Sequence, residues 1–229
     1  MNARVLDLGC GAGGTGYAFA CAGSTVVAAD IRMDFRHPHD SITYFGTRAE
    51  QLPFSDKSFD IIIMQDVWEH LPDLERSLSE VRRIIDPNGC LYISTPNRWS
   101  LLNVTADPHW HVPLVSVLPR RKVEWVIKKL LKRDTRERDD WAELSSLRKI
   151  TSRLKHHGFA IKFHNRDVVE TMFAQPEKVI CKQGHISFIN KCNNWKIGSL
   201  FTRIVNDKHG VFNTVINPTW YLVATKKDS

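Results

Sequence analysis

The five cysteines of this sequence include no Cys-x-x-Cys pair, and one thiol is left over if the others pair. An odd, unpatterned set predicts reduced cysteines and argues against a disulfide framework. The sequence also has little that could enter a membrane. Residues 8–29 are uncharged, but five glycines between positions 9 and 16 argue against a signal-peptide helix, and no other uncharged stretch approaches bilayer length. We therefore expect a soluble, cytoplasmic protein.

Internal repeats and low-complexity tracts are absent as well, and 229 residues suit one domain with insertions. The net charge of +7 is uneven: residues 120–155 hold 13 Lys and Arg against 6 Asp and Glu. The pattern of 122–133 predicts a basic amphipathic helix. Such a helix can contact an anionic membrane peripherally through residues 120–133, at its inner face. The alternatives are a cap over an acceptor pocket and a helix packed on the core. A nucleic-acid partner is disfavoured because no Asn/Asp-Pro-Pro-Tyr/Phe motif occurs.

A dense glycine turn follows the first apolar run, Val5 to Leu8. The run predicts a buried parallel strand, and residues 15–22 predict a helix made of small residues. A strand, a glycine turn and a helix N-terminus form the usual cradle for a nucleotide-like ligand. Asp7 lies before the first glycine, where its charge would repel a pyrophosphate and attract a cation. The alternative is a glycine-rich loop without a ligand.

A second strand, residues 24–31, ends at Asp30, about 20 residues after the glycine turn. An acidic side chain at this spacing can accept hydrogen bonds from both hydroxyls of a ribose. Ile31 would then lie flat against the adenine or ribose. The alternative is an ordinary surface aspartate at a strand end.

Further strands are predicted at 42–46, 59–64, 90–94, 158–163 and 219–225. Helical spacing covers 73–85, with Asp73 as N-cap, and 144–157. Residues 86–89, Asp-Pro-Asn-Gly, predict a helix stop followed by a turn. Gln65 and Asp66 follow the fourth strand, and ligands of parallel sheets bind at that end.

Several motifs together resemble the class I S-adenosylmethionine (SAM) methyltransferases. They are Asp-x-Gly-x-Gly-x-Gly from Asp7, Arg-Ala-Glu-Gln-Leu-Pro-Phe from Arg48 with Ser-Phe-Asp after it, the pair Glu69-His70, and Ser-Thr-Pro-Asn at 94–97. Within that class the chain resembles the ubiquinone- and menaquinone-biosynthesis-like branch, methyltransferase type 11. It implies an α/β, Rossmann-like sheet of seven strands in the order 3-2-1-4-5-7-6, with strand 7 antiparallel.

The resemblance further implies a single methyltransferase domain over residues 1–229, with helical cap insertions at about 98–143 and 166–216. Family members place one or two helices before the first strand, and here that strand begins almost at Met1. Either another segment covers the cofactor, or the chain is a truncated or split product.

The implied cofactor is SAM, whose sulfonium and ammonium suit acidic partners. Relatives carry an aspartate where this chain has Arg48, and arginine cannot accept a hydrogen bond from adenine. Adenine recognition would then rest on the Ala49 backbone, Glu50 or a water. The predicted cofactor-binding residues are Asp7, Gly9, Cys10, Gly11, Gly13, Asp30, Ile31, Ala49, Glu50, Gln65 and Asp66.

Three histidines are candidate general bases, in the order His111, His109 and His70, since imidazole titrates near neutral pH. Residues 107–111 read Asp-Pro-His-Trp-His. This spacing also suits a metal, but without a further ligand cluster we predict no metal site. The resulting hypothesis is O-methylation of a small or lipid-like acceptor. The alternatives are a non-catalytic SAM-binding partner protein and a nucleic-acid methyltransferase that uses the basic segment.

Overall fold

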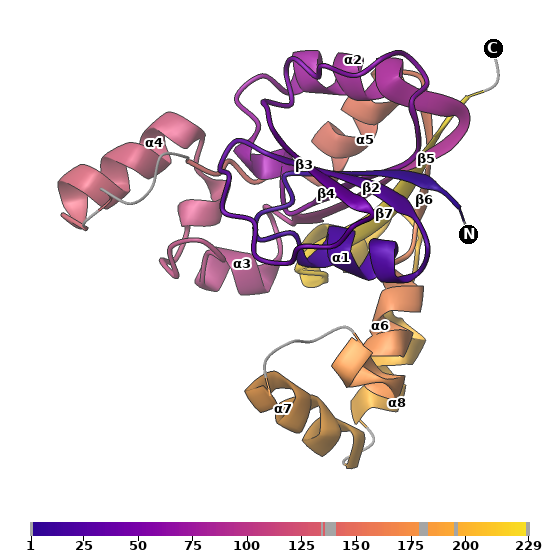
Figure 1. The fold of residues 1–229 in the computed structure, drawn as a ribbon. Helices are drawn as coiled ribbons and strands as arrows, with labels where there is room; N and C mark the ends of the chain where they lie inside the picture. Colours follow the sequence, from indigo (N-terminus) through magenta and orange to yellow (C-terminus); the bar gives the residue numbers. More distant parts are fainter. Residues whose placement is uncertain (1, 134, 136–140, 179–182, 195–196, 228–229) are drawn as a thin grey trace.

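A seven-stranded sheet forms the centre of the protein in a computed structural model, which describes residues 2–133, 135, 141–178, 183–194 and 197–227 (Figure 1). The strand order is β3-β2-β1-β4-β5-β7-β6, and β7 runs antiparallel to both of its neighbours. Both features confirm the expected topology. The strands are β1 (Arg4–Leu8), β2 (Thr25–Asp30), β3 (Ile42–Gly46), β4 (Phe59–Gln65), β5 (Ile85–Pro96), β6 (Phe159–Phe163) and β7 (Thr219–Lys226).

Helices cover both faces of the sheet, with α2 and α5 on one side and α1 on the other (Figure 1). The α-helices are α1 (Gly14–Cys21), α2 (Leu74–Ile84), α3 (Leu101–Thr105), α4 (Arg120–Trp125), α5 (Leu147–His156), α6 (Asn165–Ala174), α7 (Gln183–Asn194) and α8 (Ile197–Ile204). Shorter turns are η1 (Trp68–His70), η2 (Val115–Val117), η3 (Val126–Leu130, π-helical), η4 (Pro176–Lys178) and η5 (Phe212–Ile216). No helix in the described ranges is both long and apolar enough to cross a membrane.

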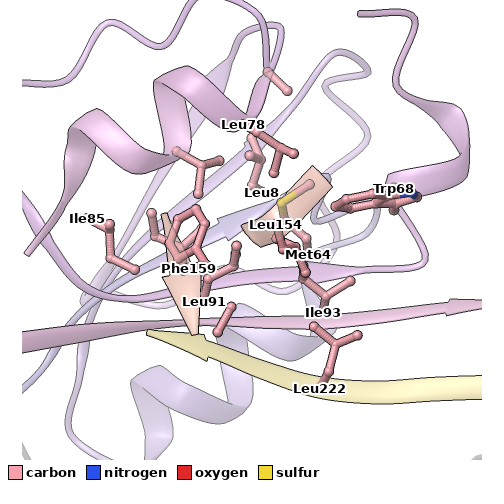
Figure 2. Packing of buried hydrophobic residues seen from close by; sticks show 14 of the residues in the cluster. Leu8, Met64, Trp68, Leu78, Ile85, Leu91, Ile93, Leu154, Phe159 and Leu222 are labelled. Atoms are coloured by element: carbon pink, nitrogen blue, oxygen red, sulfur yellow. The ribbon is translucent and has the colours of Figure 1, made fainter. Parts of the chain in front are cut away.

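The larger core lies between the sheet and the pair α2 and α5 (Figure 2). Leu78 and Leu154 from these helices are fully buried against sheet residues such as Met64 and Leu91. Each such side chain contributes about 1.5–3 kcal/mol through its removal from water. The predicted cap of α2 is confirmed, because Asp73 accepts a hydrogen bond of 3.0 Å from the backbone N–H of Arg76.

Two predicted elements differ from the structure. Residues 86–89 do not separate helix from strand: they lie within β5, where pairing jumps from Phe59–Ile85 to Ile61–Cys90. The turn chemistry is still present there, since Asp86 accepts from the N–H of Asn88 at 2.9 Å. This forms an irregular bulge on one strand. The predicted helix 122–133 also differs in its bounds. In the structure α4 begins at Arg120 and continues into the π-helical turn η3, which ends at Leu130.

The segment between β6 and β7 forms α6, α7 and α8, which extend from one end of the sheet in Figure 1. Its return to the sheet depends on Asn213, which is completely buried. The Asn213 amide donates to the carbonyls of Asn206 and Lys208 at 2.7 and 2.9 Å. Its Oδ1 accepts from the side chain of Asn165 at 3.0 Å, and its carbonyl accepts from Trp220 Nε1 at 2.7 Å.

We expect Asn213→Ala to lower the free energy of unfolding by roughly 2–4 kcal/mol, because it leaves several buried polar groups without a partner. Urea denaturation followed by circular dichroism measures this. The exposed neighbour Thr214, whose hydroxyl donates to the carbonyl of Gly210 at 2.8 Å, provides the control. Thr214→Ala should change stability by less than about 1 kcal/mol. Equal effects of both substitutions would contradict the role of Asn213.

Candidate functional site

A cavity of about 680 Å³ opens where β1, β2 and β4 end. Its volume suits a ligand of cofactor size. The lining includes Gly9, Gly11, Asp30, Ile31, Ala49, Glu50, Asp66 and His70 from the residues singled out in the sequence. Asp7, Cys10, Gly13 and Gln65 do not line it.

The glycine turn is held in place from the side of β2. The N–H groups of Gly9 and Cys10 both donate to the carbonyl of Ala29, at 2.7 and 3.1 Å. Gly11 has φ of +50°, and a Cβ at this position would meet no protein atom within 4 Å. Glycine is therefore needed here for its backbone conformation, and the space beside it is open to a ligand.

Asp7 lies beneath the turn and supports it. Its side chain is 2 % exposed, and its Oδ2 accepts a hydrogen bond of 2.8 Å from the N–H of Gly16 in the first turn of α1. Burial raises the pKa of Asp7 to about 6, with a smaller contribution from the nearby charge of Asp30. Asp7 thus positions the turn from below, and its charge acts on the site through the turn.

Asp30 reaches the cavity directly. Its Oδ2 accepts from the N–H of Gly11 and its Oδ1 from the N–H of Arg32, both at 2.8 Å. A carboxylate has about four acceptor positions, so two remain for a ligand. Ile31, the next residue, is 61 % exposed and lines the same cavity.

The opposite wall comes from the segment after β3. Glu50 lines the cavity, and its Oε1 is buried without a hydrogen bond from any described residue. Its other oxygen lies 3.7 Å from Nε of Arg48. A buried acceptor without a donor is costly unless a ligand supplies the donor. Glu50 is therefore the residue of this wall best suited to a ligand N–H.

The end of β4 provides Asp66, which has the left-handed φ of 54° that is uncommon outside glycine. Burial raises its pKa, although Ser94 Oγ donates to it at 3.2 Å. Strained residues of this kind concentrate at functional sites. Gln65 instead accepts a hydrogen bond from Thr15 Oγ1 at 3.1 Å, outside the cavity.

Two of the three candidate histidines meet, although they lie far apart in the sequence. The rings of His70 and His109 are perpendicular, with centroids 5.0 Å apart, and only His70 lines the cavity. Buried Glu69 joins them: Oε2 accepts from Thr95 at 2.8 Å, and Oε1 is 3.8 Å from Nε2 of His109. His111 is exposed. The histidine that was expected last is thus the one at the cavity.

The Asp-x-His-x-His segment does not gather as a metal set. Asp107 is buried, and its Oδ1 accepts from the N–H groups of His109 and Trp110 at 2.9 and 2.8 Å, which fixes the turn. Among the residues that the structure describes, Glu69, His70 and His109 could hold a metal, since their ligand atoms lie within 4.8 Å of one another. This set joins the sequence pair Glu69-His70 to one histidine of the later motif.

Two further cavity residues, Arg120 and Trp141, were not predicted as site residues. The guanidinium of Arg120 donates from Nη2 to the carbonyls of Glu69 and Leu71 at 3.1 and 3.0 Å, so it holds the turn that carries His70. Trp141 stacks on Trp110 with centroids 5.2 Å apart. The basic composition of 120–133 was visible in the sequence, but the contact of its first residue with the η1 turn was not.

Known proteins resemble this chain in sequence and in fold. The family model described as "Methyltransferase domain", type 11, matches residues 6–93. A ubiquinone biosynthesis O-methyltransferase of Rhizobium rhizogenes is 36 % identical over 103 residues, which are 42 % of each chain. Another, from Bartonella bacilliformis, is 33 % identical over 116 residues, 45 % of this chain and 47 % of the relative. The matched stretch spans less than half the length of these curated relatives.

Solved structures show the same fold. A SAM-dependent methyltransferase of Mesorhizobium loti aligns with a TM-score of 0.61 and 18 % identity, over 97 % of this chain and 90 % of that one. Sheet order, antiparallel β7 and the glycine turn define a class I SAM-dependent methyltransferase fold. Residues 6–93 are similar to the type 11 methyltransferases, in agreement with the motifs of the sequence.

The buried carboxyl of Asp7 gives a test of the site's electrostatics. The folded protein holds the Asp7 proton more tightly than the unfolded chain does, so ionisation costs stability. This loss in the free energy of unfolding is absent below pH 3.8 and complete above about pH 6, where it amounts to about 3 kcal/mol. Asp7→Asn removes this dependence. The stability of the variant relative to wild type should therefore rise by about this amount between pH 4 and pH 8 in ligand-free protein, measured by urea denaturation. A difference independent of pH would contradict the assignment.

Proposed function

We propose that this protein transfers the methyl group of SAM to an oxygen of a small-molecule acceptor. The observation that carries the proposal is a continuous cavity from the glycine turn to His70. Its first part suits a nucleoside and its last part a reacting hydroxyl. The curated relatives named above are O-methyltransferases, which supports oxygen as the acceptor atom.

The residues present fit SAM in three respects. The open space at Gly11 admits a ligand against the turn, and Asp30 retains two acceptor positions for ribose hydroxyls. The free Oε1 of Glu50 can accept from the adenine amino group. Four carboxylates, of Asp30, Asp34, Glu50 and Asp66, line the cavity with three arginines, so the lining keeps a small excess of negative charge for a cationic ligand.

Bound SAM supplies a methyl group on a positively charged sulfur, which is open to attack from the opposite side. The chain's own contribution is alignment, which can supply about 7–11 kcal/mol. His70 is our candidate base, because it lines the cavity and can take the acceptor proton as the C–O bond forms. Glu69 and His109 lie next to it, with ligand atoms of the three side chains within 4.8 Å of one another, and can orient the ring.

Asp30→Ala should weaken SAM binding on the order of 100-fold, because charge-assisted hydrogen bonds to the ribose are lost. Isothermal titration calorimetry measures the affinity. Asp40→Ala, an exposed carboxylate outside the cavity, is the matched control and should bind as wild type does. A thermal melt shows whether Asp30→Ala remains folded. Unchanged affinity in the folded variant would refute the ribose assignment.

His70→Gln should lower kcat by roughly 10²–10⁴-fold and leave SAM affinity within about threefold of wild type. Release of S-adenosylhomocysteine is measured with catechol and a panel of phenols and aliphatic alcohols. His111→Ala should retain full turnover, since that side chain is exposed away from the cavity lining. Loss of turnover in His111→Ala with retention in His70→Gln would reverse the assignment. SAM binding without turnover on any acceptor would favour a non-catalytic SAM-binding protein.

A further inference from the structure

Nearly all of the protein's net charge lies on one short segment of the cap. Residues 120–133 hold seven Lys and Arg and one acid, Glu124, a net charge of +6 out of +7 for the whole chain. The segment forms α4 and η3, which project from the sheet in Figure 1. Charge concentrated in this way attracts anionic partners.

The inward face of this helix is already occupied. Val123 and Ile127 are buried in a small core with Trp110 and Val115, so the apolar residues that the sequence assigned to one amphipathic face serve partly for packing. Arg133 donates to the carbonyl of Trp110 and fastens the end of the segment. The helix is therefore held by the protein, and its outer surface is available to a partner.

The outer surface combines cations with large apolar side chains. Trp125, Leu130 and Leu131 are 59 %, 63 % and 40 % exposed. Of the lysines, Lys128 pairs with Glu124 at 2.8 Å. Four exposed cations make no ion pair within the part of the chain that the structure describes: Arg121, Lys122, Lys129 and Lys132. We call these four cations, with Trp125, Leu130 and Leu131, the basic cap face.

We propose that the basic cap face docks on the surface of an anionic lipid bilayer. Exposed lysines are attracted to acidic headgroups, and tryptophan prefers the boundary between headgroups and acyl chains. Exposed leucines gain by entering that boundary, whereas a nucleic-acid backbone offers them nothing. The mixture of cations with Trp and Leu therefore favours a membrane over a nucleic acid.

Docking would also bring the cavity to the membrane. Arg120, the first residue of α4, lines the cavity and holds the η1 turn through the carbonyls of Glu69 and Leu71. The basic cap face begins at the following residue. The cavity wall and the docking surface are thus parts of one continuous segment.

Sedimentation of the full chain with sucrose-loaded vesicles tests the proposal. Vesicles of phosphatidylcholine with about 30 % phosphatidylglycerol should bind the protein at about 50 mM salt and release it at about 500 mM. Vesicles of phosphatidylcholine alone should bind little. The variant Lys122→Gln/Lys129→Gln/Lys132→Gln should bind the anionic vesicles about 100-fold more weakly, at roughly fivefold for each charge.

Two further variants separate the contributions. Trp125→Ser should also weaken binding, whereas Phe201→Ser on α8, an exposed apolar residue outside the basic cap face, should not. His70→Gln should bind vesicles as wild type does, so the docking test is independent of the proposed activity. The proposal is overturned if the triple variant binds as wild type does, if neutral vesicles bind equally, or if the protein binds duplex DNA and no vesicles.

Discussion

The site depends on two carboxylates that hold one glycine turn from different sides. Asp7 accepts from Gly16 below the turn, and Asp30 accepts from Gly11 beside it. The two strands that carry them are adjacent and parallel, with Leu8 paired to Ala29, so the two negative charges are held close together. The charge of Asp30 contributes to the raised pKa of Asp7. A cationic ligand above the turn would relieve that repulsion, and the proposed affinity for SAM rests on this.

Much of the sheet could be predicted because its signals are local. Short apolar runs mark the strands, and glycine and asparagine mark where they end. Asp30 was found because the distance from the glycine turn to the acid at the end of the next strand is nearly fixed in such folds. The bulge at residues 86–89 was missed because the same residues suit a turn between elements and a bulge within one. Only the pairing of Phe59 with Ile85 distinguishes these two cases.

The reactive end of the cavity was harder to predict because its residues come from distant segments. His70 and His109 are 39 positions apart, and no periodicity links a turn after β4 to a turn after α3. The sequence therefore favoured the two histidines of the Asp-Pro-His-Trp-His motif as bases only because that motif is rich in polar side chains. The structure separates them, since Asp107 fixes a turn that brings His109 against His70 and leaves His111 exposed. Gln65 was likewise expected at the cavity by its place at a strand end, but its partner is Thr15.

Charged side chains gather in the cavity and in the segment beside it. Four carboxylates and three arginines line the cavity, and the strongly basic segment follows directly outside it. Arg120 belongs to both, because its side chain binds the carbonyls of the η1 turn and its backbone begins α4. A displacement of α4 would therefore be transmitted to the turn that carries His70, through the hydrogen bonds of 3.1 and 3.0 Å from Arg120. An anionic partner would bind the outer surface of α4, and a cationic ligand would bind in the cavity. The two are compatible, because they lie on different sides of Arg120.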